Sequence, residues 1–313
     1  MTHSHFDFMQ RSVDIVGTSK HPANKVAATL VGEDHEGKPY IISKTNHWPD
    51  AIAERIGTDV RIGNSSGTIH AETECLLHAP GATKGASVYA TDPPCPNCMK
   101  NMAEAGIRRL YIDHKGFEKD FAQRRGEAVE NMSMRIAAKA GIDVYTINRK
   151  TKTIEALSLR ADDYKPALDN PPSVTLCGCG DFTEALAPMH GHFGYDPFAM
   201  ALAEDTAQHV HCVAASPHLT IGYTQETAED PQSKYSFVME PINRVLMLCA
   251  RYGYTIKPDC LYSSRVPSSR ELVNLVGAGF SCLRIGDIHS ARDEHGPRAL
   301  EQLRNAGLVS IKT

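Results

Sequence analysis

The stretch "TIHAETECLLHAPGATKGASVYATDPPCPNC", residues 68–98, places a histidine and a glutamate two positions apart and ends on two cysteines three positions apart. The imidazole of His70 and the thiols of Cys95 and Cys98 are ligands that favour zinc over hard cations such as magnesium. A structural zinc normally takes four protein ligands, whereas a catalytic zinc keeps one position for water. Three ligands therefore predict a catalytic site with one zinc ion per chain. A structural site would need a distant fourth ligand, for which the candidates are His78, His114 and Cys75.

The spacing of His70 and Glu72 places them at the end of a helix rather than along its side. Residues two apart on a helix are rotated by about 200°, so both can reach one ion only beyond the helix terminus. We therefore expect a helix over residues 70–78 that begins at Gly67 or Thr68. Its free N–H groups and positive dipole end would favour an anionic oxygen near the metal.

The two cysteines begin a second predicted helix, over residues 96–105, and share one edge of its first turn. Two thiolates cancel the formal charge of zinc, so a bound water is less acidified than in an all-histidine site. A neighbouring base must then take the proton of that water. Glu72 is the predicted general acid and base.

The pattern H-x-E followed by P-C-x-x-C resembles the signature of the zinc-dependent nucleobase deaminases, the cytidine and deoxycytidylate deaminase superfamily. The strand and helix order of residues 6–148 is similar to that family as well. The resemblance implies hydrolytic deamination of a base, in which Glu72 protonates the ring nitrogen and then the departing ammonia. It also implies that the backbone N–H of Ala71 and the side chain of Asn46 contact the substrate.

The surroundings of Asn46, "IISKTNHWPDAI", are similar to the N-G-x-P-x-G stretch of deoxycytidylate deaminases, although His47 and Ala51 stand where that family often has glycine. Glu74 replaces the asparagine of the H-A-E-x-N pattern, and its charge would disfavour a phosphate nearby. The predicted substrate is a cytosine nucleotide or nucleoside. Guanine, another purine or a free base stays open, as does a non-catalytic, zinc-stabilised regulator that binds nucleotides.

The loop of residues 47–68 contains two further candidate substrate contacts, since long loops at an active site often set specificity. Trp48, the only tryptophan, would stack on a base, and Arg61 would bind a phosphate. The alternatives are a core position for Trp48 and a solvated position for Arg61.

Apolar segments in the first half alternate between strand and helix patterns. Strands are predicted over residues 26–31, 40–43, 87–91, 109–113 and 143–147, and further helices over residues 6–16 and 121–140. Such alternation predicts a three-layer α/β/α domain with a mixed five-stranded sheet. The long connection between residues 113 and 143 suits a helical crossover, so the last two strands should run parallel.

The second half repeats the order of the first. A shift of 173 positions sets residues 89–113 on residues 262–286 without a gap, with seven identical positions. The predicted architecture is therefore two tandem cytidine-deaminase-like domains, residues 1–150 and 173–313, joined by a charged, proline-terminated linker, residues 151–172. The four zinc-site positions fall on Asn243, Val245, Ser268 and Glu271, so the second domain is expected to lack the metal.

Composition limits the remaining classes of protein. The net charge of −4 and pI near 6.4 disfavour a long nucleic acid as substrate and favour a small base, nucleoside or nucleotide. The sequence has no membrane span or signal peptide, which predicts a cytoplasmic protein. Nine cysteines without a framework pattern predict reduced thiols. The sequence leaves open a homodimer, and a second metal at Cys177, Cys179, His190 and His192.

Overall fold

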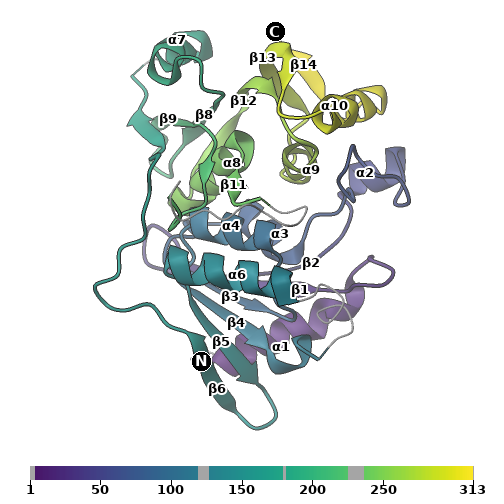
Figure 1. Cartoon of the computed structure of the whole chain (residues 1–313), viewed down its shortest axis with the longest axis vertical. Helices are drawn as coiled ribbons and strands as arrows, with labels where there is room; N and C mark the ends of the chain where they lie inside the picture. Colours follow the sequence, from purple (N-terminus) through teal and green to yellow (C-terminus); the bar gives the residue numbers. More distant parts are fainter. Residues whose placement is uncertain (1–3, 119–126, 179–180, 225–235, 313) are drawn as a thin grey trace. The chain divides into compact units, whose positions relative to one another are not determined.

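The structure is a computed structural model that describes residues 4–118, 127–178, 181–224 and 236–312 (Figure 1). The chain divides into two compact units that alternate along the sequence. Unit 1 comprises Met1–His47, His70–Asp169 and Leu219–Val238, and unit 2 comprises Trp48–Ile69, Asn170–His218 and Met239–Thr313. None of the helices that the structure describes has the length and apolar character needed to cross a membrane. The cysteines in the described part of the chain are free.

Unit 1 contains a six-stranded mixed sheet in the order β2-β1-β3-β4-β5-β6. Strand β1 runs antiparallel to β2 and β3, and β3, β4 and β5 are parallel, which confirms the predicted crossover. Its strands are β1 (Ala27–Glu33), β2 (Pro39–Thr45), β3 (Ser87–Ala90), β4 (Arg109–Asp113), β5 (Asp143–Asn148) and β6 (Thr153–Ser158). Its helices are α1 (His5–Ile15), η1 (Val16–Thr18), α3 (Ala71–Leu77), α4 (Pro96–Glu104), η2 (His114–Gly116) and α6 (Glu127–Ala140).

The sixth strand corrects the expectation of five strands. Residues 151–172, predicted as a linker, contain β6, which pairs antiparallel with β5. The charged residues at the start of that stretch form the turn, where Lys152 adopts a positive φ of 57°. The alternation that follows in Thr153–Ser158 is a strand pattern that the charge of the segment concealed.

Helices cover both faces of this sheet (Figure 1). Alternate residues of each strand point to opposite faces, so Tyr89, Tyr111 and Ile147 meet Met9 of α1. Helices α3, α4 and α6 cover the other face. The predicted α/β/α layers are therefore present, and α3 and α4 lie on one side of the sheet.

Unit 2 contains a second six-stranded mixed sheet, in the order β14-β13-β12-β8-β9-β7. Its strands are β7 (Ser173–Leu176), β8 (Ala199–Glu204), β9 (Val210–Ala215), β12 (Thr255–Val266), β13 (Cys282–Ala291) and β14 (Ser310–Lys312). Its helices are α2 (Asp50–Arg55), α7 (Phe182–Phe193), α8 (Pro241–Tyr252), α9 (Ser269–Gly277) and α10 (His295–Asn305). A separate two-stranded sheet pairs β10 (His218–Leu219) with β11 (Val238–Met239).

Five strands of unit 2 have the order and directions of five strands of unit 1. In β9-β8-β12-β13-β14, the first two pairs are antiparallel and the last two are parallel, as in β2-β1-β3-β4-β5. The extra strands differ, since β6 pairs with β5 whereas β7 pairs with β9. In unit 2, Phe198 and, from β8, Met200 and Leu202 pack toward Phe182 of α7, so one face of this sheet is also covered by a helix.

The elements predicted for the first half are confirmed within one or two residues at most ends. The exception is the start of the helix predicted at 121–140, which lies outside the described residues. Helix α2 was not predicted. The division into domains at residues 150 and 172 stays a prediction, because the compact units interleave segments from both halves.

Candidate metal centre and active site

The three predicted metal ligands lie at the N-termini of α3 and α4. His70 is the N-cap of α3 (φ −82°, ψ 149°) and Cys95 is the N-cap of α4 (φ −75°, ψ 164°). Neither side chain caps its own helix, although N-cap side chains commonly do so. Helix α3 thus begins at Ala71, not at Gly67 or Thr68. The predicted start was wrong because His70 is extended and Gly67 has a positive φ of 75°.

The ligand atoms are close enough for one zinc ion. His70 Nδ1 lies 3.4 Å from Cys95 Sγ and 3.3 Å from Cys98 Sγ, and the two sulfurs are 3.6 Å apart. A tetrahedral zinc with ordinary bond lengths separates such donors by about 3.5 to 3.8 Å. The pKa of the Cys98 thiol is raised, first by the hydrogen bond between Cys98 and Cys95 and then by burial. A cation that stabilises the thiolates is what this buried pair requires.

These three residues are the only group of metal donors among the residues that the structure describes. Two of the alternative fourth ligands have other partners. His78 Nε2 lies 3.3 Å from Glu74 Oε1, and Cys75 Sγ donates to the carbonyl of Ala28. The donor set therefore fits an open site better than a closed structural one.

Glu72 lies beside the ligand group. It is the second residue of α3 and is 3% exposed, and its Oε2 lies 3.6 Å from Cys98 Sγ. A carboxylate in the first turn is favoured by the helix dipole. The arrangement places a buried proton acceptor next to three metal donors, two of which are buried as well.

A hydrogen bond fixes the two helices relative to each other close to the ligands. Asn101 Nδ2 of α4 donates to Thr73 Oγ1 of α3 over 3.1 Å, and that hydroxyl lies 3.7 Å from Cys98 Sγ. All three residues are buried. Asn101 is one of the seven positions that are identical under the shift of 173, where it falls on Asn274, but no pattern in the sequence marks it as a support of the site.

Asn46 and Ala71 lie in the same unit as the metal donors. Ala71 is the first residue of α3, so its N–H has no partner within the helix. Asn46 Oδ1 accepts from Ser19 Oγ (2.7 Å) and Val26 N (2.8 Å), and Nδ2 donates to Asn24 O (2.7 Å). Asn46 therefore holds the segment before β1, in addition to any contact with a substrate.

That segment contains His21, a residue that sequence reasoning missed. Burial and, to a smaller extent, the charge of nearby His70 lower the pKa of His21. Its Nδ1 accepts from the backbone N–H groups of Asn24 (3.0 Å) and Ala23 (3.3 Å), so a neutral ring carries its proton on Nε2. A histidine in a loop with no motif gave no signal in the sequence.

Trp48 and Arg61 belong to unit 2. Trp48 is 6% exposed, and its Nε1 donates to Ser66 O over 3.1 Å, so the ring occupies a core position. Arg61 is exposed, and its carbonyl accepts from Gln302 Nε2. Their contacts with a substrate stay predictions.

Glu74 is buried on α3 among three basic groups. Its Oε1 lies 3.3 Å from His78 Nε2, 3.8 Å from Lys44 Nζ and 3.9 Å from His47 Nε2. Its Oε2 has no hydrogen-bond partner within the described residues. The negative charge of Glu74 is thus offset locally, which weakens the argument that it would repel a phosphate.

The second predicted metal group does not come together in the described part of the chain, and Cys179 lies outside that part. Cys177 packs against the apolar cluster of unit 2. The ring of His190 contacts the edge of Phe198 at 5.3 Å between centroids. Cys177 therefore contributes to the apolar cluster, whereas His190 is exposed on α7.

Comparison with known proteins agrees with the donor set. Residues 2–114 match the family model "Cytidine and deoxycytidylate deaminase zinc-binding region". An "Uncharacterized deaminase in luxG 3'region" of Aliivibrio fischeri is 29% identical over 133 residues, 42% of this chain and 85% of that protein. Deoxycytidylate deaminases of Enterobacteria phages T2 and T4 are 40% identical over 50 residues, 15% of this chain and 27% and 26% of theirs.

Among solved structures, the dCMP deaminase of cyanophage S-TIM5 in complex with dCMP and dUMP is similar over 45% of this chain and 93% of its own, at 18% identity and a TM-score of 0.32. Its apo form gives 20% identity and a TM-score of 0.31. The family match is the stronger finding. Residues 2–114 are thus similar to the zinc-binding region of cytidine and deoxycytidylate deaminases, and they contain His70, Cys95 and Cys98.

Proposed function

We propose that the protein hydrolyses the exocyclic amino group of a cytosine nucleotide or nucleoside and releases ammonia. The observation that carries this proposal is the Glu72 carboxylate, 3.6 Å from Cys98 Sγ, beside a donor set of His70, Cys95 and Cys98. A zinc-stabilised binding module would have no use for a buried carboxylate at that place. An open metal position and an adjacent base are what hydrolysis requires.

His70, Cys95 and Cys98 would hold the zinc ion, one per chain in unit 1. When bound, zinc supplies the Lewis acidity that makes a water molecule nucleophilic near neutral pH. Glu72 accepts a proton from that water and delivers it to N3 of the cytosine ring as C4 is attacked. It then passes the second proton to the departing amino group, which leaves as ammonia and yields the uracil base.

The first substrate contacts that we propose come from residues of unit 1. The N–H of Ala71, at the start of α3, is directed out of the helix and suits the carbonyl at C2 of the base. One N–H of the Asn46 amide has no partner among the described residues and suits a ribose hydroxyl. Trp48 and Arg61 remain candidates for base stacking and phosphate binding.

Two observations favour a cytosine nucleotide over a purine as the substrate. The relatives in this comparison include deoxycytidylate deaminases, and their similarity to this chain is 40% over the 50 aligned residues. Lys44 and His47 offset the charge of Glu74, so the one departure that argued against a phosphate loses most of its weight. Guanine and other purines stay as the alternative that a substrate panel decides.

The deciding experiment combines Glu72→Gln with such a panel. Ammonia release and absorbance change are followed with dCMP, deoxycytidine, cytidine, cytosine, guanine and adenine. Glu72→Gln should lower kcat by about a thousandfold or more while zinc content stays the same, because the amide cannot carry the proton. Glu74→Gln, the same change on the other side of α3, should keep most of the activity.

Three outcomes separate the candidates. Turnover of dCMP that depends on Glu72 supports the proposal, and turnover of guanine alone selects the purine alternative. A protein that binds zinc and nucleotide but turns over none of the panel is the regulator. Full activity of Glu72→Gln would remove the role given to this carboxylate.

A further inference from the structure

Two segments of the chain belong to a different compact unit from the residues on either side of them. Residues 48–69 lie in unit 2, although they connect β2 to α3 of unit 1. Residues 219–238 lie in unit 1, although they connect β9 to α8 of unit 2. A shift of 173 positions sets residues 219–238 on residues 46–65. The two halves therefore exchange the same connection, the one that precedes the helix of the zinc motif.

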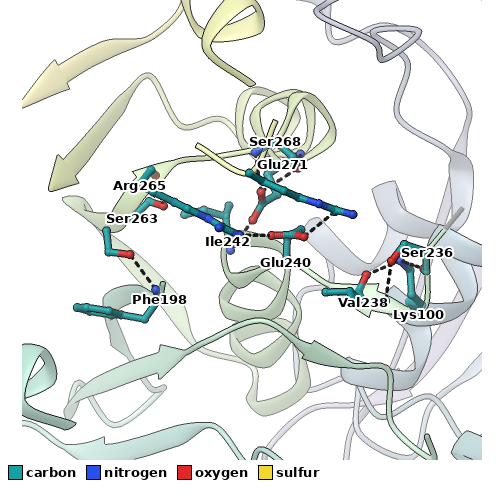
Figure 2. A network of polar contacts seen from close by, with 12 residues as sticks. Lys100, Phe198, Ser236, Val238, Glu240, Ile242, Ser263, Arg265, Ser268 and Glu271 are labelled. Carbon is teal, nitrogen blue, oxygen red and sulfur yellow. Dashed lines mark hydrogen bonds and ion pairs between the residues drawn. The ribbon is translucent and has the colours of Figure 1, made fainter. Parts of the chain in front are cut away.

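The segment given to unit 1 is held by Lys100 of α4. Lys100 Nζ donates to the carbonyls of Ser236 and Val238, both over 2.7 Å (Figure 2). Lys100 is 7% exposed and lies two residues after Cys98. Burial of an ammonium group costs free energy unless hydrogen bonds compensate it, so this contact selects the position of the segment. The position that the shift sets on Lys100 is Val273, which is fully buried.

The segment is also packed closely at its other described end, Leu219–Thr224. Gly222 N donates to Ala167 O over 2.8 Å, and a Cβ at Gly222 would lie 2.0 Å from Lys139 O. Tyr223 and Phe237 are each 4% exposed, with ring centroids 4.6 Å apart. These contacts place Gly222, Tyr223 and Phe237 in the core of unit 1.

The segment given to unit 2 is held in a comparable way. Arg270 of α9 donates to Thr68 O, and Ser269 Oγ accepts from Asn64 N over 3.4 Å. In each unit, a basic side chain near the start of the helix in the cysteine-motif position binds backbone carbonyls of the received segment. The two basic residues are not at matching positions, so the same arrangement is built from different side chains.

We propose that two stretches from the C-terminal half, residues 219–224 and 236–238, complete the core of unit 1, and that Lys100 is the positioning residue that ties the second stretch to the helix bearing Cys95 and Cys98. Helix α4 is then fixed on two sides, by Asn101 to Thr73 of α3 and by Lys100 to the second stretch. The inference deepens the proposed function, and its kinetic part rests on that function.

The test measures zinc release from the full-length protein to a chromogenic chelator, a readout that does not require turnover. Lys100→Met removes the ammonium and keeps the volume of the side chain. Two hydrogen bonds from a charged donor are lost, so zinc should leave about tenfold faster or more. With substrate, kcat should fall while KM changes little, since α4 positions the metal ligands. Lys100→Arg, which can also reach two carbonyls, should restore most of both, and exposed Lys84→Met should match the wild type.

A second variant keeps the test decisive if Lys100→Met does not fold. Gly222→Ala displaces the first stretch, residues 219–224, whereas Gly85→Ala has the same kind of positive φ (83° against 93°) with no atom within 4 Å. Zinc should leave Gly222→Ala faster than Gly85→Ala. Wild-type zinc release from both Lys100→Met and Gly222→Ala would overturn the inference. If zinc release responds as expected but no substrate is deaminated, the proposed function fails and the inference stands.

Discussion

The N-termini of α3 and α4 in unit 1 can be compared with those of α8 and α9 in unit 2. Helices α4 and α9 are both nine residues long, and they begin directly after Cys95 and Ser268, their N-caps. Cys98 and Glu271 are both the third residue of their helix. The scaffold of the cysteine motif is thus the same, and the difference lies in what occupies the space between two helix N-termini.

In unit 2 that space is closed by a carboxylate. Glu271 Oε1 accepts from Ile242 N of α8, and Oε2 accepts from both the N–H and the hydroxyl of Ser268, each at 2.8 Å (Figure 2). Two helix N-termini favour an anion between them. In unit 1 the sulfurs and a cation would satisfy this preference, and in unit 2 one acidic side chain does. The same pair of helix N-termini can therefore be occupied either by metal donors or by a hydrogen-bonded carboxylate.

The first helices also begin at different points. The shift of 173 positions sets Ala71 on Arg244, but α8 already begins at Pro241. Asn243, which corresponds to His70, is therefore inside the helix rather than at its N-cap. The N-cap of α8 is Glu240, whose carboxylate pairs with Arg265 at 3.1 Å (Figure 2). It also pairs with Arg292 at 2.6 Å.

The largest expected effect comes from giving unit 1 the residues of unit 2. Cys95→Ser with Cys98→Glu should remove zinc from the protein and lower activity by more than about a thousandfold, because two of three ligands are replaced. The fold should survive better than in Cys95→Ser alone, since the new carboxylate can bridge the helices. Metal analysis and thermal unfolding check this. Retention of one zinc per chain by the double variant would show that Cys95 and Cys98 are not needed to hold the metal.

The reverse exchange should fail to create a second metal site. Asn243→His with Ser268→Cys and Glu271→Cys supplies the same donor types, but position 243 lies within α8, so the imidazole is not presented at the helix end. The zinc content should stay at the wild-type value. Stability should fall by roughly 3 kcal/mol as the hydrogen bonds of Glu271 are lost. A second zinc in this triple variant would show that the helix start is not decisive.

The sequence predicted the fold of unit 1 and its metal donors because both depend on local patterns. The strand and helix periods, the two prolines beside Cys95 and the spacing of His70 and Glu72 are readable without tertiary contacts. Three features were missed: β6, the position of His21 near His70, and the placement of residues 48–69 in unit 2 and of residues 219–238 in unit 1. A charged hairpin is similar to a linker in composition, and an exchange of connections leaves the local sequence unchanged. Contacts such as Lys100 with Ser236 become visible only in three dimensions.

A smaller effect is expected from the pH dependence of Glu271. Burial, followed by repulsion from Glu240, raises the pKa of Glu271 from 4.5 to about 7. Folding raises the pKa of this carboxyl, so ionisation of Glu271 lowers the stability of the folded protein. The contribution of protonated Glu271 to stability is therefore fully present below pH 4.5 and is lost as pH rises through 7. Glu271→Gln should therefore be closest to the wild type in acid and should show a flatter dependence of Tm between pH 5 and 8.

Thermal unfolding at several pH values measures this difference. Exposed Glu301→Gln is the matched control and should follow the wild-type curve. Arg265 and Arg292 face Glu240 and are unchanged in both variants, so the difference isolates the group at position 271. A Glu271→Gln curve parallel to that of the wild type would mean that this carboxyl titrates at its ordinary pKa.

The smallest expected effect concerns an asparagine that both units have at the same position of the repeat. Asn101 Nδ2 donates to Thr73 Oγ1 at 3.1 Å, and Asn274, its counterpart in the repeat, donates to Asn243 Oδ1 at 2.9 Å. Each bond ties the second helix to the first, and both asparagines are buried. Alanine at either position should lower the free energy of unfolding by about 1 to 2 kcal/mol. Only Asn101→Ala should also speed zinc release, since Thr73 lies 3.7 Å from Cys98 Sγ and unit 2 has no ligand to disturb among its described residues. Equal zinc release from Asn101→Ala and Asn274→Ala would mean that this bond supports the scaffold alone.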